Sequence, residues 1–567
     1  MCGKKGVEYM PRTISIGRQS YETIITKKNF YIDKTLFIKD WWENDDDVTL
    51  VTRPRRFGKT LNLDMLNCFF STKYKDRAEL FEGLKIWEYE EYRKMQGTYP
   101  VIFLSFAGIK ECDYESAVYG ISRNISKLYA DNAYLMTSPK LLESEKREIK
   151  KRAEKIERYE IPYTINELCT YISKHYCGKK VIIFLDEYDT PLQEAYVNGY
   201  WNEMSGLIRS LFNNTFKTNE NLSRAVLTGI TRVSKESMFS DLNNLELCTM
   251  SSEKYKEYFG FTEKEVFKAM DEYGYKNREE VKYWYDGFTI GTEHAMYNPW
   301  SIINFLDKGI FAPYWSNTSS NNLAGKLIKE GSKNIKIDFQ TLLEGGTIIK
   351  KIDTEMVFSR LSSDEDAVWS LLVSSGYMKP ISQSGKKSEI TITNYEVRQM
   401  FESLVEDWFG EESSDYNDFI RALLKGNVYE MNKTMNELSL SMFSSFDTGN
   451  RPSERLRPER FYHGFVLGLL VELRDRYIIT SNRESGYGRY DVMLEPKNAE
   501  ENDGIIIEFK VYDEEYGEKT LEDTIKSALI QIEEKKYAQT LTEHGVPEEK
   551  IRKYGFAFEG KKVRIGM

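Results

Sequence analysis

The sequence predicts an α/β fold class, with a parallel sheet flanked by helices in the N-terminal half and a smaller α/β unit at the C-terminus. Three apolar runs that end in polar residues predict the first sheet; they are VTLVT at 48–52, VIIFLD at 181–186 and RAVLTGI at 224–230. A further run, IIIEFK at 505–510, predicts a buried strand of the C-terminal unit. Such runs are typical of strands that are covered on both faces.

Composition limits the function classes. The chain has 567 residues, 41% of them apolar, which is enough for more than one hydrophobic core. We expect a cytoplasmic protein without a membrane partner, because no apolar run is long enough to span a bilayer and the first ten residues lack the core of a signal peptide. The net charge of −10 excludes a generally basic surface. The six cysteines form no C-x-x-C pair and there are only four histidines, so any metal is expected to have oxygen ligands.

The loop after the first strand, RPRRFGKT at 53–60, organises the N-terminal half and precedes a predicted helix at 61–70. Backbone N–H groups at a helix N-terminus bind anionic oxygens, Lys59 would reach the terminal phosphates, and the Thr60 hydroxyl would ligate Mg²⁺. Arg53 stands where a Walker A loop has its first glycine, so context must support the GKT ending. The residues expected to hold the nucleotide are Arg56, Phe57, Gly58, Lys59, Thr60 and Leu61.

The ends of the next two strands supply that context. Asp186 and Glu187 follow VIIFL, at the carboxyl edge where α/β sheets bind ligands. Asp186 is expected to hold Mg²⁺ through water, and Glu187 to polarise the attacking water. Thr231 and Arg232 follow RAVLTGI and are placed to sense the γ-phosphate.

These segments carry a family resemblance. RPRRFGKT, FLDEYD and LTGITR, in this order and with YIDKT upstream, resemble the bacterial AAA-ATPase-like family of P-loop proteins, which is often joined to a PD-(D/E)XK nuclease domain. The double arginine before GKT is also similar to archaeal-type ATPases. The resemblance implies a P-loop NTPase sheet over residues 1–250, with ATP and Mg²⁺ as cofactors. A GTPase is disfavoured because no N-K-x-D motif follows the strands.

The middle of the chain is predicted to be mainly helical. Over 251–337 we expect a helical lid, with a capping box that begins at Thr262 and an N-cap at Asn298 before Pro299. Over 338–450 a helix, a hairpin and another helix predict a winged-helix-like unit and a helical connector. We favour a bracing role for this unit, with DNA reading as the alternative.

The C-terminal domain, 451–567, is predicted to contain a metal site. Glu508 and Lys510 lie on the same face of their strand, and Asp491 lies on the preceding strand. Asp491 and Glu508 would hold one or two Mg²⁺ ions that lower the pKa of a bound water. Lys510 would stabilise the hydroxide or the charge that develops on the phosphate.

A second resemblance covers this domain. FYHGFVLGLL, SNRESGYGRYD, IIEFK and ALIQIEEKKYA are similar to the PD-(D/E)XK nuclease-like domain, which implies a restriction-endonuclease-like fold. Gln531 matches the glutamine that such domains carry on the last helix, here predicted at 521–539. RecB-type nucleases have Q-x-x-x-Y there, but Tyr537 stands six residues on, off the same helical face, and receives no role.

Further candidates precede the nuclease motif. Glu459 or Glu472 would supply a third carboxylate, and His463 a phosphate contact or a hydrogen-bonded core histidine. The arginines between 451 and 460 would track a nucleic-acid backbone or form a solvated linker.

The sequence therefore predicts an ATPase whose nucleotide state controls a nuclease that cleaves nucleic acid. By analogy with ATPase–nuclease fusions, its setting would be a mobile element or phage defence. The alternative is a nucleotide-gated switch or scaffold whose C-terminal domain binds nucleic acid or protein without cutting. The intact Asp491, Glu508 and Lys510 favour the nuclease. Assembly into a homo-oligomer stays open.

Overall fold

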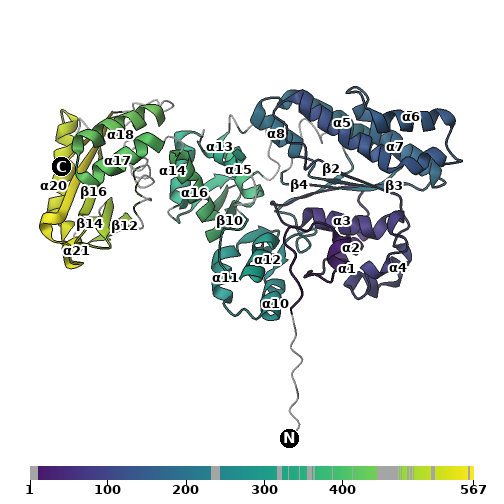
Figure 1. Cartoon of the computed structure of the whole chain (residues 1–567), viewed down its shortest axis with the longest axis horizontal. Coiled ribbons are helices and arrows are strands. Elements are labelled where there is room, and N and C mark those ends of the chain that lie inside the picture. The colour runs from purple at the N-terminus through teal and green to yellow at the C-terminus, as the bar shows by residue number, and fades with distance from the viewer. Residues whose placement is uncertain are drawn as a thin grey trace, which may run out of the picture. The chain divides into compact units, whose positions relative to one another are not determined.

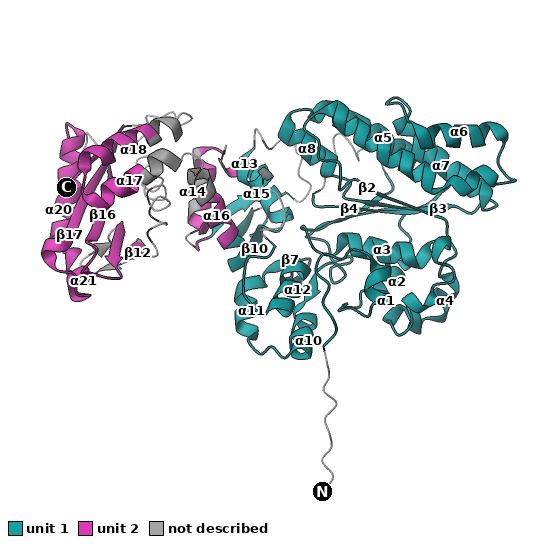
Figure 2. Cartoon of the chain, in the orientation of Figure 1, with its two compact units in different colours: residues 1–327, 347–398 teal, residues 328–346, 399–567 magenta. Residues whose placement is uncertain are grey.

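The computed structural model divides into two compact units, which Figure 2 colours separately: unit 1, residues 1–327 with 347–398, and unit 2, residues 328–346 with 399–567. The four-part division expected from the sequence stays a prediction. The structure describes residues 11–231, 243–315, 322–329, 331–343, 345–353, 361, 364–385, 387–410, 413–442, 466, 470, 473, 476–481, 484–485, 488–489, 491–512, 518–559 and 562–567.

Unit 1 is built on the predicted parallel sheet, whose strands lie in the order β2-β3-β4-β1-β5. β1 and β3 are buried at every position, as expected for strands covered on both faces. Because β4 lies between β1 and β3, the carboxyl ends of these three strands meet at one edge of the sheet. The strands are β1 Val48–Thr52, β2 Val101–Ser105, β3 Val181–Asp186, β4 Leu222–Gly229 and β5 Leu245–Cys248.

Helices cover both faces of this sheet (Figure 1). α1 to α4 lie against one face, and α5, α6, α7 and α8 lie on the other. Aromatic side chains fill the first layer, where the Trp41 ring lies 5.5 Å from Phe70 and 5.9 Å from Phe184 on β3. The helices are α1 Tyr21–Thr26, α2 Leu36–Asn44, α3 Lys59–Phe70, α4 Glu90–Met95, α5 Tyr114–Asp131, α6 Glu143–Glu154, α7 Ile161–His175, α8 Thr190–Asn198 and α9 Trp201–Phe212.

Residues 251–315, the first part of the predicted lid, contain a small antiparallel sheet, in the order β6-β8-β7, and three helices. Its predicted helix starts are confirmed: the Thr262 hydroxyl accepts from Glu265 N and the Glu265 carboxylate accepts from Thr262 N, while the Asn298 side chain accepts from Trp300 N. The elements are β6 Phe261–Thr262, α10 Glu263–Tyr273, α11 Arg278–Tyr285, β7 Phe288–Ile290, β8 Glu293–Tyr297 and α12 Pro299–Lys308.

The predicted helix, hairpin and helix of the winged-helix-like unit are present. The hairpin turns at Gly385, whose φ of +62° suits glycine, and a third strand completes an antiparallel sheet in the order β10-β11-β9. The elements are α13 Asn322–Lys329, β9 Ile348–Lys351, α15 Glu365–Ser374, β10 Met378–Ser384, β11 Lys387–Ile392 and α16 Tyr395–Gly410.

Unit 2 contains a five-stranded mixed sheet in the order β12-β15-β16-β17-β18, in which only the β16–β17 pair of the described strands is parallel. β16 buries Ile505, Ile507 and Phe509 in one core and Ile506 in another. Its even-numbered side chains therefore share the face of Ile506. The elements are α14 Lys333–Leu343, α17 Ser413–Lys425, α18 Val428–Met442, β12 Tyr477–Ser481, β13 Glu484–Ser485, β14 Gly488–Arg489, β15 Val492–Pro496, β16 Gly504–Val511, α20 Leu521–Glu534, α21 Ala538–Glu543, β17 Ile551–Glu559 and β18 Lys562–Gly566.

Among the described residues, no helix has the length and apolar character needed to cross a membrane.

Candidate functional site

The loop between β1 and α3 meets the end of β3 through one hydrogen bond. Thr60 Oγ1 donates to Asp186 Oδ2 at 2.7 Å, and Thr228 Oγ1 on β4 donates to Asp186 Oδ1 at 2.6 Å. Asp186 is only 1% exposed, and this burial raises the pKa of its carboxyl. The structure thus brings together the predicted hydroxyl and carboxylate ligands at the carboxyl edge of the sheet.

Lys59 is the first residue of α3, and its side chain folds back onto the loop. Its ammonium donates to the carbonyl oxygens of Arg53 at 2.9 Å and Pro54 at 2.8 Å. Burial lowers the pKa of Lys59 to about 8, although the nearby carboxylates of Glu187, Asp189 and Asp186 oppose this shift. Among the described residues, this buried cation donates to neutral carbonyls, so an anion would offset the cost of burying its charge.

Gly58 and Glu187 both have backbone conformations that L side chains rarely adopt. Gly58 is the N-cap of α3 and has a φ of +80°. This conformation turns the chain from the loop into the helix, at the end where the first N–H groups of α3 lie. Glu187 has a φ of +48° and accepts a hydrogen bond from Thr190 Oγ1 at 3.3 Å. A non-glycine residue at positive φ is strained, and such residues concentrate at functional sites.

Arg53, which replaces the first Walker glycine, points into the protein and away from the loop. Its side chain is fully buried, and Nη1 donates to the carbonyls of Thr52, Cys248 and Thr249 at 2.8, 3.0 and 2.8 Å. The Arg53 N–H donates to Gly229 O at 3.1 Å and continues the β1–β4 pairing. Arg53 therefore anchors the loop to the strand ends and leaves the phosphate position clear.

The lid segment holds the loop on its other side. The Arg55 carbonyl accepts from Trp315 Nε1 at 3.0 Å and from Asn298 Nδ2 at 3.1 Å. The Arg56 guanidinium stacks on the Trp300 ring at 4.6 Å, so this residue, expected to bind nucleotide, has its side chain on the lid. Gly260 N donates to Phe57 O at 3.1 Å.

An apolar cleft opens beside the loop. It leaves about 90 Å³ of free space, less than a typical small-molecule site, and it is open to solvent. Phe57, Gly58 and Leu61 form one wall, and the side chains of Ile14, Phe30 and Ile303 are among the others. The N-terminal segment that contains YIDKT, which received no role from the sequence, thus lies next to the predicted nucleotide residues.

Asp189 is a site residue that sequence reasoning missed, although it ends the quoted run FLDEYD. It is 1% exposed, and its Oδ2 accepts from Ile230 N and Thr231 N, each at 2.9 Å, and from Gln193 Nε2 at 2.8 Å. Its Oδ1 accepts no hydrogen bond from the described residues, and a Cβ at Gly229 would approach this atom to 2.8 Å. Asp189 therefore fixes the backbone of Thr231 after β4. Arg232 lies outside the described residues.

The second candidate centre lies in unit 2. Antiparallel pairing of Val492 with Ile507 brings Asp491 beside Glu508, and Phe509 N donates to Asp491 Oδ2 at 2.8 Å. Burial raises the pKa of Asp491 to about 6, although the Phe509 N–H and Lys510 oppose this shift. Glu508 is 2% exposed. Two nearly buried carboxylates on adjacent strands are an arrangement that a cation would stabilise.

Gln531 joins the remaining members of this centre. Its Nε2 donates to Glu508 Oε1, and its Oε1 accepts from Lys510 Nζ at 2.7 Å. The predicted cluster of Asp491, Glu508, Lys510 and Gln531 is therefore brought together around the even-numbered face of β16.

Tyr537 also belongs to this centre, contrary to the expectation from helical periodicity. α20 ends at Glu534 and not at 539, and Lys536 takes a φ of +52°, so the chain turns back before Tyr537. Tyr537 is 1% exposed and hydrogen-bonds with Gln531, while burial raises the pKa of its hydroxyl. The helical-face argument failed because the two residues do not share a helix.

Both centres provide oxygen donors of the kind that Mg²⁺ prefers. Thr60 with Asp186, and Asp491 with Glu508, provide donor atoms that suit this cation. Both aspartates are largely buried, so a bound cation would offset the free-energy cost of burying their negative charge. Across the described ranges, no group of three or more His, Cys, Asp or Glu side chains is arranged to hold a metal. The two sites would therefore need phosphate oxygens or water to complete the coordination.

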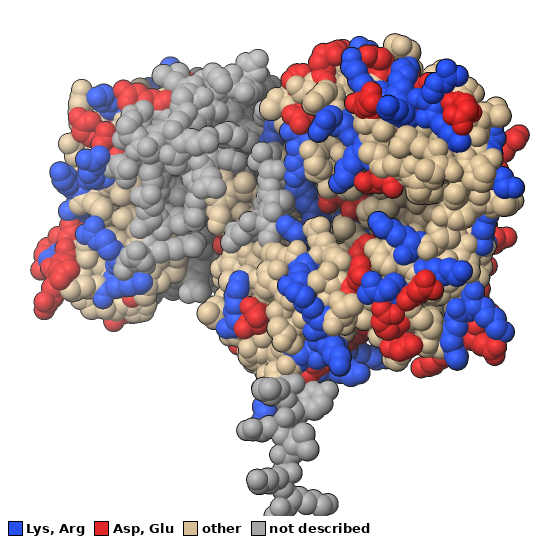
Figure 3. All heavy atoms as spheres, turned by 45° about the vertical axis from the view of Figure 1, so that its right-hand side comes forward, with Lys and Arg blue, Asp and Glu red and all other residues tan. Residues whose placement is uncertain are grey.

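Several predicted residues cannot be placed. Glu459, Glu472, His463 and the arginines between 451 and 460 lie outside the described residues. On the face shown in Figure 3, basic and acidic side chains are interspersed, in keeping with the net charge of −10. Contact with nucleic acid would have to be local.

Comparison with known proteins supports both resemblances. Residues 15–239 match the family model described as a predicted AAA-ATPase, and residues 457–567 match the PD-(D/E)XK nuclease superfamily. The chain is 28% identical over 326 residues to an uncharacterized protein in the vnfD 5′ region of Azotobacter chroococcum mcd 1. That match covers 56% of this chain and 56% of the relative, so the chain spans about half the length of the curated relative it matches.

Proposed function

We propose that this chain, in which an AAA-ATPase-like domain precedes a PD-(D/E)XK nuclease superfamily domain, hydrolyses ATP and uses its nucleotide state to control metal-dependent cleavage of nucleic acid. The observation that carries the proposal is the hydrogen bond between Thr60 and Asp186, because it joins the phosphate loop to the carboxylate that a nucleotide-bound cation requires.

In the nucleotide site, the N–H groups at the start of α3 and the Lys59 ammonium would bind the phosphates. Thr60 and Asp186 would hold Mg²⁺, which neutralises phosphate charge when bound. Glu187 would take a proton from the attacking water, and Thr231, held by Asp189, would contact the terminal phosphate. The cleft beside Gly58 and Leu61 offers apolar walls for the base.

In unit 2, Asp491 and Glu508 would hold the metal, which lowers the pKa of its bound water when present. The Lys510 ammonium would contact the scissile phosphate. Gln531 would hold the side chains of Lys510 and Glu508 in place through its two hydrogen bonds. The lid at 251–337 and the winged-helix-like unit and connector at 338–450 would transmit the nucleotide state. A mobile-element or anti-phage setting and a cytoplasmic location are part of the proposal; assembly into a homo-oligomer stays open.

The nuclease is tested with the purified full-length chain and single- and double-stranded DNA and RNA, with Mg²⁺ or Mn²⁺, with and without ATP. We expect cleavage that Asp491→Ala and Glu508→Ala each abolish. Glu543→Ala, which removes an exposed carboxylate of α21, is the matched control and should cleave normally. Cleavage that survives both active-site changes would contradict the nuclease assignment.

The nucleotide site is tested separately by titration with a fluorescent ATP analogue. Lys59→Ala should lower the affinity at least about 100-fold, since the loop loses its cation for the terminal phosphates. The same variant should also lose any effect of ATP on cleavage. An unchanged affinity would show that the loop does not bind nucleotide. If the unsubstituted chain cleaves at a rate that ATP does not change, the protein is a nuclease without nucleotide control. If the unsubstituted chain does not cleave, the switch or scaffold role is favoured.

A further inference from the structure

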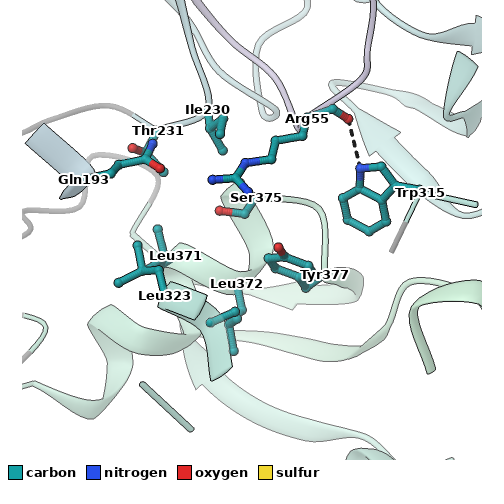
Figure 4. Close-up of a pocket in the computed structure, with 11 residues that line it drawn as sticks. Arg55, Gln193, Ile230, Thr231, Trp315, Leu323, Leu371, Leu372, Ser375 and Tyr377 are labelled. Carbon is teal, nitrogen blue, oxygen red and sulfur yellow. Dashed lines mark hydrogen bonds between the residues drawn. The ribbon is translucent and has the colours of Figure 1, made fainter. Parts of the chain in front are cut away.

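Arg55 is the loop residue whose guanidinium lies over the end of β4. Figure 4 shows its side chain extending from the loop toward Ile230 and Thr231, with Gln193, Ser375 and Tyr377 around the same recess. Thr231 follows β4, and Gln193 lies on α8, the helix that follows Asp186 and Glu187. The side chain therefore lies at the edge where the proposed γ-phosphate and attacking water would be.

The backbone of Arg55 is held in place through its carbonyl oxygen. Its carbonyl accepts hydrogen bonds from Trp315 and Asn298, at 3.0 and 3.1 Å. The preceding Pro54 lies so close to Gly376 that a Cβ there would come within 2.7 Å of the proline ring. These contacts fix where the side chain starts, and preorganised positioning is what lets a charge stabilise a transition state.

The Arg55 guanidinium also acts electrostatically on Lys59, the proposed phosphate-binding lysine. The positive charge of Arg55 opposes protonation of Lys59 and so helps to lower its pKa. Burial raises the pKa of Tyr377, and the charge of Arg55 opposes that rise. The recess leaves only about 30 Å³ free, too little for a phosphate, so a phosphate would lie outside it.

We propose that Arg55 is a catalytic arginine supplied in cis, whose guanidinium contacts the γ-phosphate and stabilises the charge that develops as the bond to the β-phosphate breaks. This rests on the proposed ATPase function and deepens it, because it removes the need for an arginine from a second protein. An arginine in this role contributes roughly 10³- to 10⁵-fold to the rate of phosphoryl transfer. The lid residues Asn298 and Trp315 then act as positioning residues, since they hold the Arg55 carbonyl.

The first test is steady-state ATP hydrolysis by full-length variants. Arg55→Gln keeps much of the side-chain stem and removes the charge; we expect kcat to fall at least about 100-fold, while the Kd for ADP changes less than about threefold. Arg55→Lys should recover part of kcat, because lysine keeps the positive charge but lacks the planar guanidinium that can donate two parallel hydrogen bonds. Arg123→Ala, on the exposed surface of α5, is the control and should keep full activity.

The second test asks whether the arginine acts within its own chain. Equal amounts of the Arg55→Gln and Lys59→Ala chains are mixed, and hydrolysis is followed over a range of protein concentrations. An arginine that acts in trans would restore activity at interfaces that combine the intact Lys59 of one chain with the intact Arg55 of the other. We expect no restoration, and a specific activity of the unsubstituted chain that does not depend on its concentration.

Full activity of Arg55→Gln, or restored activity in the mixture, would overturn this inference and leave the proposed ATPase intact. Absence of hydrolysis in the unsubstituted chain would instead contradict the ATPase itself, and the inference with it.

Discussion

Thr60 and Asp186, which are 126 residues apart in the chain, are joined by a 2.7 Å hydrogen bond between a hydroxyl at the start of α3 and a carboxylate at the end of β3. Neither strand order nor loop geometry alone would bring them together. The contact depends on β4, which lies between β1 and β3 and contributes Thr228 to the second oxygen of the same carboxylate.

Asp186→Asn should uncouple nucleotide binding from Mg²⁺. The amide keeps the shape of the side chain and an oxygen that accepts from Thr60, but it supplies no negative charge to a cation. We expect ATP affinity without Mg²⁺ to stay within about threefold, the tightening by Mg²⁺ to be lost, and hydrolysis to fall at least about 100-fold. Nucleotide titration with and without Mg²⁺ measures this. Asp113→Asn, at the exposed N-cap of α5, is the control; a full Mg²⁺ effect in Asp186→Asn would refute the assigned role.

Arg53→Gly should restore the Walker pattern and yet harm the protein. The buried guanidinium satisfies the carbonyls of Thr52, Cys248 and Thr249, and its removal leaves them without these donors. We expect a loss of about 3 kcal/mol in the free energy of unfolding, measured with urea, and no gain in ATP hydrolysis. Arg53→Met, which keeps volume but not the hydrogen bonds, should lose a similar amount. Faster hydrolysis with unchanged stability would show that arginine at this position obstructs the loop.

Tyr537→Phe should weaken cleavage without unfolding unit 2. The hydroxyl hydrogen-bonds with Gln531, which itself bonds Glu508 and Lys510, so its loss lets the glutamine move. Groups that orient metal-site side chains contribute about 10- to 100-fold, and we expect kcat of cleavage to fall by this factor with little change in substrate affinity. Tyr554→Phe, at another buried tyrosine of the same unit, is the matched control. Equal rates for the two variants would remove Tyr537 from the centre.

Glu396→Gln should make the stability of unit 1 less dependent on pH. The buried Glu396 carboxyl accepts from Trp315 N at 2.6 Å and from Ser301 Oγ at 2.8 Å, and burial raises its pKa to about 8. Because this folded-state pKa lies above the unfolded value, folding favours the protonated acid: its stabilisation is complete below about pH 4.5 and is lost as the pH rises to about 8.

The unsubstituted chain should therefore lose stability relative to Glu396→Gln between pH 5 and pH 8, by up to about 1.4 kcal/mol per pH unit. Thermal or urea unfolding at several pH values measures the difference. The exposed Glu279 provides the control variant Glu279→Gln, which should keep the pH dependence of the unsubstituted chain. Parallel stability curves for Glu396→Gln and the unsubstituted chain would show that Glu396 is charged throughout this range.

Local pattern was sufficient for much of the fold and for most candidate residues. Runs that are mainly apolar predicted β1, β3 and β16, because a strand covered on both faces buries most of its side chains. The capping residues Thr262 and Asn298 were recognisable since their side chains bond within three residues along the chain. Glu508 and Lys510 could be paired from the two-residue period of a strand alone.

Only the tertiary structure decided how Arg53, Arg55, Asp189 and Tyr537 are used. Arg53 is anchored by carbonyls 195 and 196 residues away, and Asp189 by N–H groups more than 40 residues away, so no local spacing reveals these contacts. The end of α20 before Tyr537 depends on a single left-handed residue, Lys536. The sequence by itself determined which chemical groups the protein carries and on which strands, because periodicity and turn chemistry are local. Which of those groups meet was decided by the order of strands in the sheets and by the packing of the lid, which are properties of the whole fold.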